Sequence, residues 1–196
     1  KKIRVFCPEI NEMYEKGLNY NQYNFNGIDS KLEGKYRKGH FNGVATIVSK
    51  LFELFKPNQA FFGEKDFQQT QIVKRLIDLE KHKTKLIICP TVREKNGLAM
   101  SSRNNLLSQK NRENSSIIFH NLNYVKTHFK KTDFDQIISK CIKSINSYDG
   151  FKTEYFEIVD SFSLSKQKKY CENKSYRVFV SVMVDEVRLI DNILLN

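Results

Sequence analysis

The sequence predicts an α/β fold with a partial parallel sheet, followed by a smaller α+β unit. In the first half, short apolar strands alternate with amphipathic helices, which is typical of parallel strands joined by helical crossovers. In the second half, two helical segments precede strands rich in β-branched and aromatic residues, which is typical of a separate unit. We therefore expect two domains, residues 1–107 and residues 108–196.

The elements of the first half follow from local patterns. The apolar segment KIRVF at residues 2–6 predicts a short strand, and the aperiodic residues 11–39 predict loops with short elements. From residue 41 to residue 55 apolar side chains recur at helical spacing, and Pro57 ends this helix. The next predicted elements are a strand, a helix and a strand at residues 59–62, 67–82 and 85–89. Their short connections predict parallel pairing through a right-handed crossover.

The second half shows a different pattern. Residues 108–129 and 134–146 have helical periodicity. Residues 153–160, 176–184 and 187–194 have the composition of strands, and the tetrapeptide VDEV between the last two predicts a tight hairpin. This order places a small α+β unit after a boundary near residues 106–109.

Composition limits the class of protein. The chain has 196 residues, of which 40% are hydrophobic, and a net charge of +11. It contains no apolar run of about 18 residues, so we expect no membrane-spanning segment. The lysines are scattered, which favours a solvated surface that attracts anionic substrates, although a nucleic-acid-binding module remains an alternative. Four distant cysteines without zinc-site spacing predict buried thiols, no dedicated metal site and a reducing cytoplasm.

A charged segment follows the strand at residues 59–62. Gly63 permits close approach of the backbone to a ligand, and the free N–H groups of the next helix favour phosphate. Lys65 adds a full positive charge, and Asp66 has the position and side chain of a helix cap. By itself the GEKD segment could also be an ordinary turn between a strand and a helix, because it lacks the known glycine-rich phosphate signatures.

A second polar segment follows the strand at residues 85–89. Ser101 and Ser102 can donate hydrogen bonds to phosphate oxygens, and Arg103 can bind two oxygens at once. Ligands of open α/β sheets bind beyond the carboxyl ends of the strands. Because both polar segments leave from such ends, we expect them to face one crevice and to hold the phosphates of a nucleotide.

Other polar residues lie near these segments in the predicted fold. Gln68 and Gln69 begin the helix after the first segment, where a glutamine could bind a substrate hydroxyl or carboxylate. Arg37 and His40 precede the first long helix, where a structural role is the alternative.

The residues quoted above match a known family. The segments GHFNGVATIVSKLFELFKPNQAFFGEKDFQQTQIVKRL and CPTVREKNGLAMSSRNNLLS resemble those of pantothenate synthetases, and EINEMY, LEGKYRKGHF and RVFVSVMVDEVRLIDNILL fit the same pattern. The resemblance covers essentially the whole chain. It implies a Rossmann-like, nucleotidylyltransferase-like domain, followed by a small C-terminal domain. It also implies the condensation of (R)-pantoate with β-alanine to pantothenate through pantoyl adenylate, which consumes ATP and yields AMP and pyrophosphate.

The resemblance also implies roles for single residues. ATP would be bound by two loops, one formed by Gly63, Glu64, Lys65 and Asp66 and the other by Met100, Ser101, Ser102 and Arg103. Val92 would hold the adenine side, Gln69 would bind pantoate, and Arg37 and His40 would lie near the pocket. Lys65, Ser101, Ser102 and Arg103 would act in catalysis, with Mg²⁺ accompanying ATP as substrate. The family is usually dimeric, so a homodimer is a further expectation.

The sequence departs from the family pattern in one respect. The HxGH segment with which members of the family contact ATP phosphates does not occur in it. We therefore expect a fragment that corresponds to the C-terminal two-thirds of the enzyme. The alternative functions are an inactive remnant that still binds nucleotide and a basic nucleic-acid-binding module.

Overall fold

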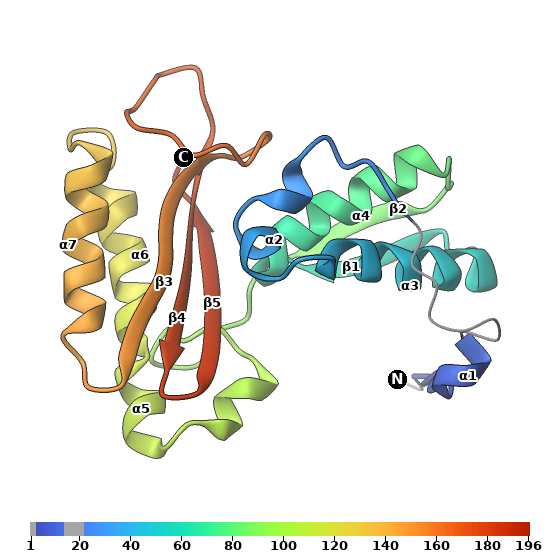
Figure 1. Cartoon of the computed structure of the whole chain (residues 1–196), viewed down its shortest axis with the longest axis horizontal. Helices are drawn as coiled ribbons and strands as arrows, with labels where there is room; N and C mark the ends of the chain where they lie inside the picture. The colour runs from blue at the N-terminus through green and yellow to red at the C-terminus, as the bar shows by residue number, and fades with distance from the viewer. Residues whose placement is uncertain (1–2, 14–21) are drawn as a thin grey trace.

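The computed structural model describes residues 3–13 and 22–196 and has two parts, which lie side by side in Figure 1. The N-terminal part contains a two-stranded parallel sheet with helices, and the C-terminal part contains a three-stranded antiparallel sheet with helices. This architecture confirms the predicted α/β fold with a smaller α+β unit.

The strand predicted at residues 2–6 is wrong. Residues 3–9 have no regular structure, and Lys2 lies outside the described residues. Ile3 and Val5 are 84% and 86% exposed. An extended segment becomes a strand only when a neighbouring backbone completes its hydrogen bonds, and no strand in the described part of the chain pairs with it.

The predicted short elements between residues 11 and 39 are present, except that residues 14–21 lie outside the described ranges. They are α1 (Ile10–Met13), the 3₁₀ turn η1 (Ile28–Ser30) and α2 (Glu33–Tyr36). The long helix α3 (His40–Phe55) follows α2 and buries one apolar face. It ends at Lys56, whose φ of 44° is left-handed, because Pro57 cannot continue a helix.

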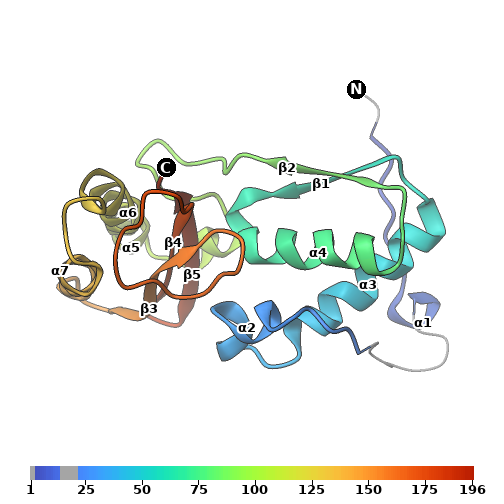
Figure 2. The ribbon, with the colours of Figure 1, turned by 90° about the horizontal axis from the view of Figure 1, so that it is seen from above.

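The parallel sheet of the N-terminal part is formed as predicted. β1 (Gln59–Gly63) pairs with β2 (Lys85–Cys89), and the register joins Gln59 to Lys85 and Gly63 to Cys89. The helix α4 (Phe67–Leu79) makes the crossover, and Figure 2 shows it along one face of the sheet, with α3 beside it. The carboxyl ends of both strands consequently meet at one edge of the sheet.

The C-terminal part begins with helices. The single helix predicted at residues 108–129 is divided into α5 (Gln109–Asn114) and α6 (Ser116–His128). Between them the Ser115 hydroxyl donates to the carbonyl oxygen of Asn111 at 2.6 Å, a bond from serine to the preceding turn that disturbs helices. α7 (Phe134–Asn146) follows with the bounds that the sequence predicts.

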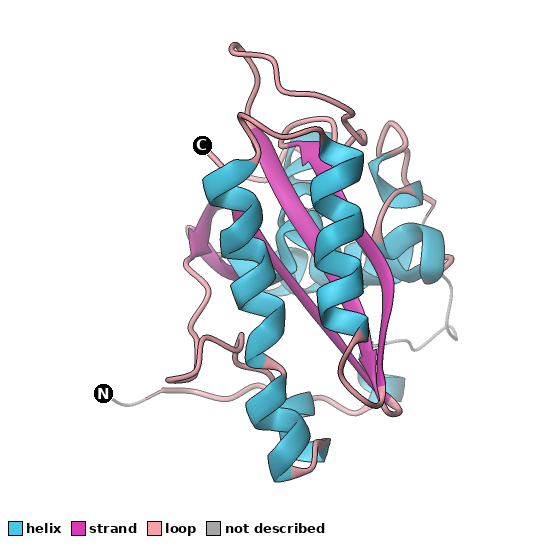
Figure 3. Ribbon diagram, turned by 90° about the vertical axis from the view of Figure 1, so that its left-hand side faces the viewer, coloured by secondary structure: helices cyan, strands magenta, loops and turns pink. Residues whose placement is uncertain are grey.

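The antiparallel sheet has the order β3 (Phe151–Asp160), β4 (Tyr176–Val184) and β5 (Val187–Leu194). Figure 3 shows α6 and α7 across one face of this sheet. Because alternate side chains of a strand point to opposite faces, Val178 and Val180 face these helices, whereas Phe179 faces the N-terminal part. Each face of the sheet therefore belongs to a different hydrophobic core.

The second core joins the two parts of the chain. It contains Ile72 and Leu76 of α4 together with Tyr155, Val159 and Phe179 of the C-terminal sheet. The N-terminal part thus packs against the sheet surface that α6 and α7 leave uncovered. This packing places the carboxyl ends of β1 and β2 beside β5.

Candidate active site

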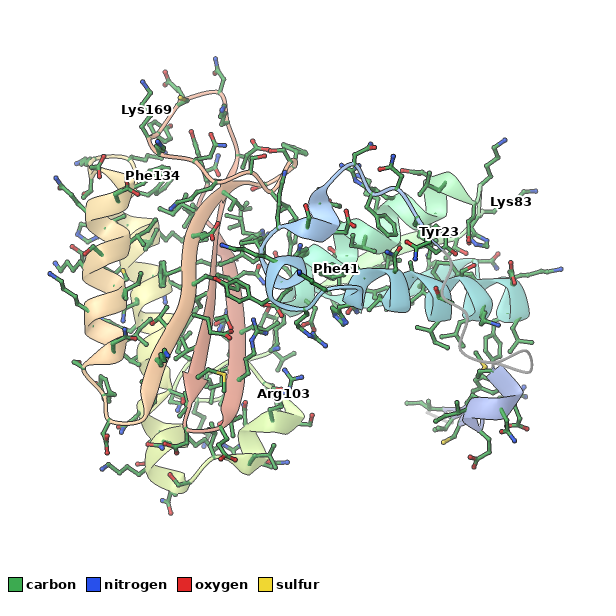
Figure 4. The ribbon with its side chains drawn as sticks, viewed as in Figure 1. Tyr23, Phe41, Lys83, Arg103, Phe134 and Lys169 are labelled. Carbon is green, nitrogen blue, oxygen red and sulfur yellow. The ribbon has the colours of Figure 1, made fainter. Side chains whose placement is uncertain are left out.

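A cavity of about 270 Å³ lies where the two parts meet, and we call it the junction cavity. Nine of its lining residues were named as candidates from the sequence: Arg37, His40, Lys65, Asp66, Gln68, Gln69, Ser101, Ser102 and Arg103. Figure 4 labels Arg103 and another lining residue, Phe41, near the meeting point of the two parts. Two loops that are far apart in the sequence therefore reach one space.

The first loop leaves the carboxyl end of β1 as a 3₁₀ turn, Glu64–Asp66. The side chain of Lys65 is 18% exposed, and its Nζ lies 4.0 Å from Asp66 Oδ1. Asp66 occupies the position before α4, but its side chain makes no capping hydrogen bond, so the predicted cap is wrong. The carboxylate instead lies within ion-pair distance of Lys65.

Gly63 and Glu64 do not line the junction cavity. Gly63 has an ordinary extended conformation with φ of −75°, and a Cβ there would meet open space, so the turn itself does not require glycine. The Glu64 carboxylate accepts a hydrogen bond from Arg177 Nη2 at 2.8 Å. Glu64 thus ties the first loop to β4.

The second loop is folded by contacts within itself and with α6. The Met100 N–H donates to the Val92 carbonyl at 2.9 Å. Gly97 has φ of +92°, and a Cβ there would lie 2.5 Å from Phe119 Cδ1, so both conformation and space require glycine. The Ser101 hydroxyl oxygen accepts from the Arg103 N–H at 3.3 Å and so caps the turn Ser102–Leu106.

Val92 and Met100 lie outside the junction cavity. Their side chains are 65% and 55% exposed, and Met100 directly precedes the lining residue Ser101. They form an apolar surface next to the cavity.

Arg37 and His40 lie on the side of the cavity that α2 and α3 provide. Arg37 Nη1 is 3.1 Å from His40 Nε2. Burial lowers the pKa of His40, and the neighbouring Arg37 charge lowers it further, so the neutral imidazole is favoured at pH 7. Lys65, Arg37 and Arg103 all line the cavity, where their charges can attract an anionic ligand.

The contribution of β3, β4 and β5 to the cavity was not predicted from the sequence. These strands supply Tyr155, Phe179, Ile190, Asp191 and Asn192. The one local signal was the Asp–Asn pair within the apolar run of β5 that follows Arg188. Burial raises the pKa of Asp191 above its ordinary value. Two hydrogen bonds from Arg93 and the charge of its guanidinium oppose this effect but do not outweigh it.

Glu33 was also missed and is the central residue of a buried network. Its carboxylate accepts from Arg188 at 2.6 and 2.8 Å and from the Tyr155 hydroxyl at 2.7 Å. Burial would raise the pKa of Glu33, but these hydrogen bonds and the arginine charges outweigh it, so the pKa lies below its ordinary value. Gln68 and Gln69 both line the cavity. The buried Gln68 accepts from the Glu33 N–H and donates to two carbonyls, so its amide is already engaged in structural hydrogen bonds.

Metal sites and membrane-spanning helices are both absent from the described residues. Within residues 3–13 and 22–196, no three His, Cys, Asp or Glu side chains gather as they would around a metal ion. Over the same ranges, no helix has the length and apolar character to cross a membrane. A parallel sheet with two polar loops at its edge and a cavity beside them defines an α/β protein whose candidate ligand site lies at the carboxyl ends of the strands.

Comparison with known proteins identifies the family. The model of the pantoate-beta-alanine ligase family matches residues 1–194. The pantothenate synthetase of Christiangramia forsetii is 42% identical over 194 residues, which cover 99% of this chain and 69% of that protein. The pantothenate synthetase of Flavobacterium psychrophilum is 40% identical over 192 residues, which cover 98% and 68%.

Solved structures give the same result. A pantothenate synthetase from Thermus thermophilus matches with a TM-score of 0.88 and 32% identity, covering 97% of this chain and 68% of that one. A pantoate-beta-alanine ligase from Francisella tularensis, complexed with β,γ-ATP and β-alanine, matches with a TM-score of 0.71 and 31% identity, covering 94% and 62%. The chain belongs to the pantoate-beta-alanine ligase family, whose reaction is the ATP-dependent ligation of pantoate to β-alanine.

Proposed function

We propose that the junction cavity binds ATP and pantoate and promotes their conversion to pantoyl adenylate. The pantoate carboxylate attacks the α-phosphorus of ATP, a new P–O bond forms and pyrophosphate leaves. The amine of β-alanine then attacks the activated acyl carbon, and AMP leaves as pantothenate forms. One observation carries the proposal: Lys65, Ser101, Ser102 and Arg103 line the same cavity although they come from two separate loops.

The proposed roles follow from the chemistry of the side chains. The Lys65 ammonium and the Arg103 guanidinium stabilise the negative charge that develops on the phosphates. The hydroxyls of Ser101 and Ser102 orient the phosphate oxygens, and Gln69 holds pantoate. Such a reaction needs alignment and charge stabilisation rather than a covalent enzyme intermediate.

The remaining predicted residues support the site from its margin. Gly63, Glu64 and Asp66 complete the first ATP loop, with the Glu64 carboxylate engaged by Arg177. Val92 and Met100 offer their exposed apolar surface to the adenine. Arg37 and His40 bound the pocket from the side of α2 and α3. The loops belong to the proposed domain of residues 1–107, and the proposed domain of residues 108–196 closes the cavity.

We propose that Mg²⁺ enters with ATP. Three acidic side chains line the cavity, and two of them, Glu33 and Asp191, are paired with arginines. The third, Asp66, is 49% exposed. This donor set fits an ion carried by the phosphates and water, and such an ion would supply further neutralisation of phosphate charge.

Cytoplasmic location and homodimer formation stay predictions. All four cysteines are free, which a reducing compartment favours. The prediction of buried thiols is wrong for Cys7 and Cys171, which are exposed. The partners of the proposed function are the small-molecule substrates pantoate, β-alanine and ATP, with Mg²⁺ accompanying ATP.

Alanine variants of the cationic residues test the proposal. We expect Lys65→Ala and Arg103→Ala to lower the rate of pyrophosphate release by roughly 100-fold or more, as loss of one preorganised charge donor does in other enzymes. The melting temperature should change little, because both side chains end in the cavity. Lys83→Ala is the matched control, since Lys83 is exposed and projects into solvent away from the junction (Figure 4).

Separate titrations with ATP and pantoate refine the test. In Gln69→Ala the pantoate affinity should fall more than the ATP affinity. Normal turnover in both cationic variants would refute the assigned roles. Nucleotide binding without pyrophosphate release in the unmodified chain would instead favour the inactive nucleotide-binding alternative, and steep salt-dependent binding to nucleic acid would favour the nucleic-acid module.

A further inference from the structure

Two adjacent polar residues are buried in the middle of β5. Asp191 and Asn192 are 4% and 3% exposed, and both line the junction cavity. Burial of polar groups is unfavourable unless hydrogen bonds compensate for the lost water. The partners of these two side chains therefore indicate why the strand contains them.

Asn192 is bound to the first loop. Its Nδ2 donates to the carbonyl oxygens of Glu64 at 3.1 Å and of Lys65 at 2.8 Å. Its Oδ1 accepts from Arg177, which also contacts the Glu64 carboxylate. The amide thus fixes the backbone from which the Lys65 side chain extends.

Asp191 is bound to the second loop. Its carboxylate accepts from Arg93 Nη1 at 2.6 Å and from Arg93 Nη2 at 3.0 Å. The Arg93 guanidinium also donates to the Gly97 carbonyl at 3.0 Å and lies 3.9 Å from the ring centre of Phe119. This contact holds the base of the loop that carries Ser101 and Arg103.

Consecutive residues of a strand point to opposite faces, so one dipeptide can hold two loops on different sides. We propose that Asp191 and Asn192 are positioning residues that fix the two phosphate-binding loops relative to each other, so that Lys65 and Arg103 meet the same triphosphate. This inference rests on the proposed function and adds the device that aligns its two halves. Small displacements matter here, because catalysis by alignment loses rate steeply with misplacement.

The substitution Asn192→Asp tests the proposal with little change in volume. Aspartate retains an oxygen for Arg177 but replaces the amide donor by an oxygen that faces two carbonyls. We expect about tenfold weaker ATP binding in a calorimetric titration and about tenfold lower kcat/KM for ATP in pyrophosphate release. The pantoate KM should stay within about twofold, because Gln69 belongs to α4 and not to the turn.

Asn121→Asp is the matched control for a merely structural effect. Asn121 of α6 is 4% exposed, and its Nδ2 donates to the Ile117 carbonyl and to the Ser144 hydroxyl, away from the cavity. Both substitutions remove a buried amide donor, so both should lower the melting temperature. Only Asn192→Asp should change the ATP titration.

A double variant separates positioning from direct contact. If Asn192 acts through Lys65, adding Asn192→Asp to Lys65→Ala should change ATP affinity by less than about twofold. The proposal is overturned if Asn192→Asp and Asn121→Asp give equal ATP affinities, or if Asn192→Asp retains its full effect in the Lys65→Ala background. An ATP affinity that Lys65→Ala itself leaves unchanged would instead refute the function proposed for the first loop.

Discussion

The two sheets of this molecule differ in how completely they are buried. In β4 of the C-terminal sheet, eight of the nine residues are buried, whereas in β1 of the N-terminal sheet none is. The difference arises because α6 and α7 cover one face of the antiparallel sheet and the N-terminal part covers the other. In β1, by contrast, Phe61 remains 64% exposed.

The two parts differ in how far the core of each relies on residues of the other. The C-terminal part has a core of its own, which includes Leu122, Phe134 and Val180. The core of the N-terminal part includes Tyr155, Val159 and Phe179, which belong to the C-terminal sheet. We infer that the N-terminal part, including the first phosphate-binding loop, depends on the C-terminal sheet more than the reverse.

Alanine substitution of one buried leucine in each core tests this inference, and these substitutions should have the largest effects on stability. Leu122 of α6 and Leu76 of α4 are both fully buried, one in each core. Replacing either by alanine should cost about 3 kcal/mol of unfolding free energy, because the removed methyl groups leave a cavity. Leu76→Ala should increase amide exchange mainly in α3, β1 and α4, whereas Leu122→Ala should increase it in both parts.

Hydrogen exchange followed by mass spectrometry on peptides from each part makes this measurement. Cooperative loss of protection across the whole chain in Leu76→Ala would contradict the unequal dependence. The conservative variant Leu76→Met should retain most of the protection, since its volume is nearly the same.

A substitution in the contact between the two parts should have the next largest effect on stability. In the original protein the Glu33 carboxylate accepts two hydrogen bonds from Arg188 and one from Tyr155. Glu33→Gln removes its negative charge, so Glu154 is then the one carboxylate that pairs with Arg188. The side chains of Glu33 and Arg188 are 10% and 18% exposed, so we expect a loss of about 2 kcal/mol at pH 7. Urea unfolding of the two proteins measures this difference.

The direction of the Glu33 pKa shift determines how the stability difference between the two proteins changes with pH. Because the pKa of Glu33 in the folded chain lies below its ordinary value of 4.5, the unfolded chain binds more protons as pH falls. The stabilisation is therefore present above pH 4.5 and is lost as pH falls through the lower, folded pKa. The difference between the original protein and Glu33→Gln should shrink over that range, and a difference that is constant from pH 7 to pH 3 would contradict the assignment.

The difference between local patterns and contacts across the two parts explains which features could be predicted from the sequence. Local periodicity gave the bounds of α7, β4 and β5 as observed and those of β1 and α4 to within a few residues, because the buried face of each element repeats along its own sequence. Glu33 and Arg188 are 155 positions apart, and no local pattern connects them. The same is true of Asn192 and Lys65, so the contribution of β5 to the cavity could not be inferred from either segment alone.

Some features of the candidate site could likewise be predicted from the sequence, whereas others could not. The two loops could be placed at one edge because parallel strands end together, which needs only the order of the elements. The pairing of Glu64 with Arg177 and the uncapped Asp66 depend on where the C-terminal sheet packs. The error at residues 2–6 has the same origin, since strand formation depends on a partner that composition does not reveal.

The smallest expected effect concerns a left-handed residue in each part. Lys56 ends α3 with φ of 44°, where a side chain is strained, and Asp185 turns the β4–β5 hairpin with φ of 50°. We expect Lys56→Gly to raise the unfolding free energy by about 0.5 kcal/mol, because glycine adopts this conformation without strain and part of the gain is lost to chain entropy. Chemical unfolding at neutral pH is precise enough when the curves of the two proteins are fitted together.

Asp185→Gly should give no such gain, because the Asp185 carboxylate accepts a hydrogen bond from Asn111 Nδ2 at 2.7 Å. Loss of this bond offsets the relief of strain. If both substitutions stabilise the protein equally, backbone strain alone governs these turns and the contact between the hairpin and α5 contributes nothing. If only Lys56→Gly stabilises it, the C-terminal part has compensated a strained turn with a side-chain contact that the end of α3 lacks.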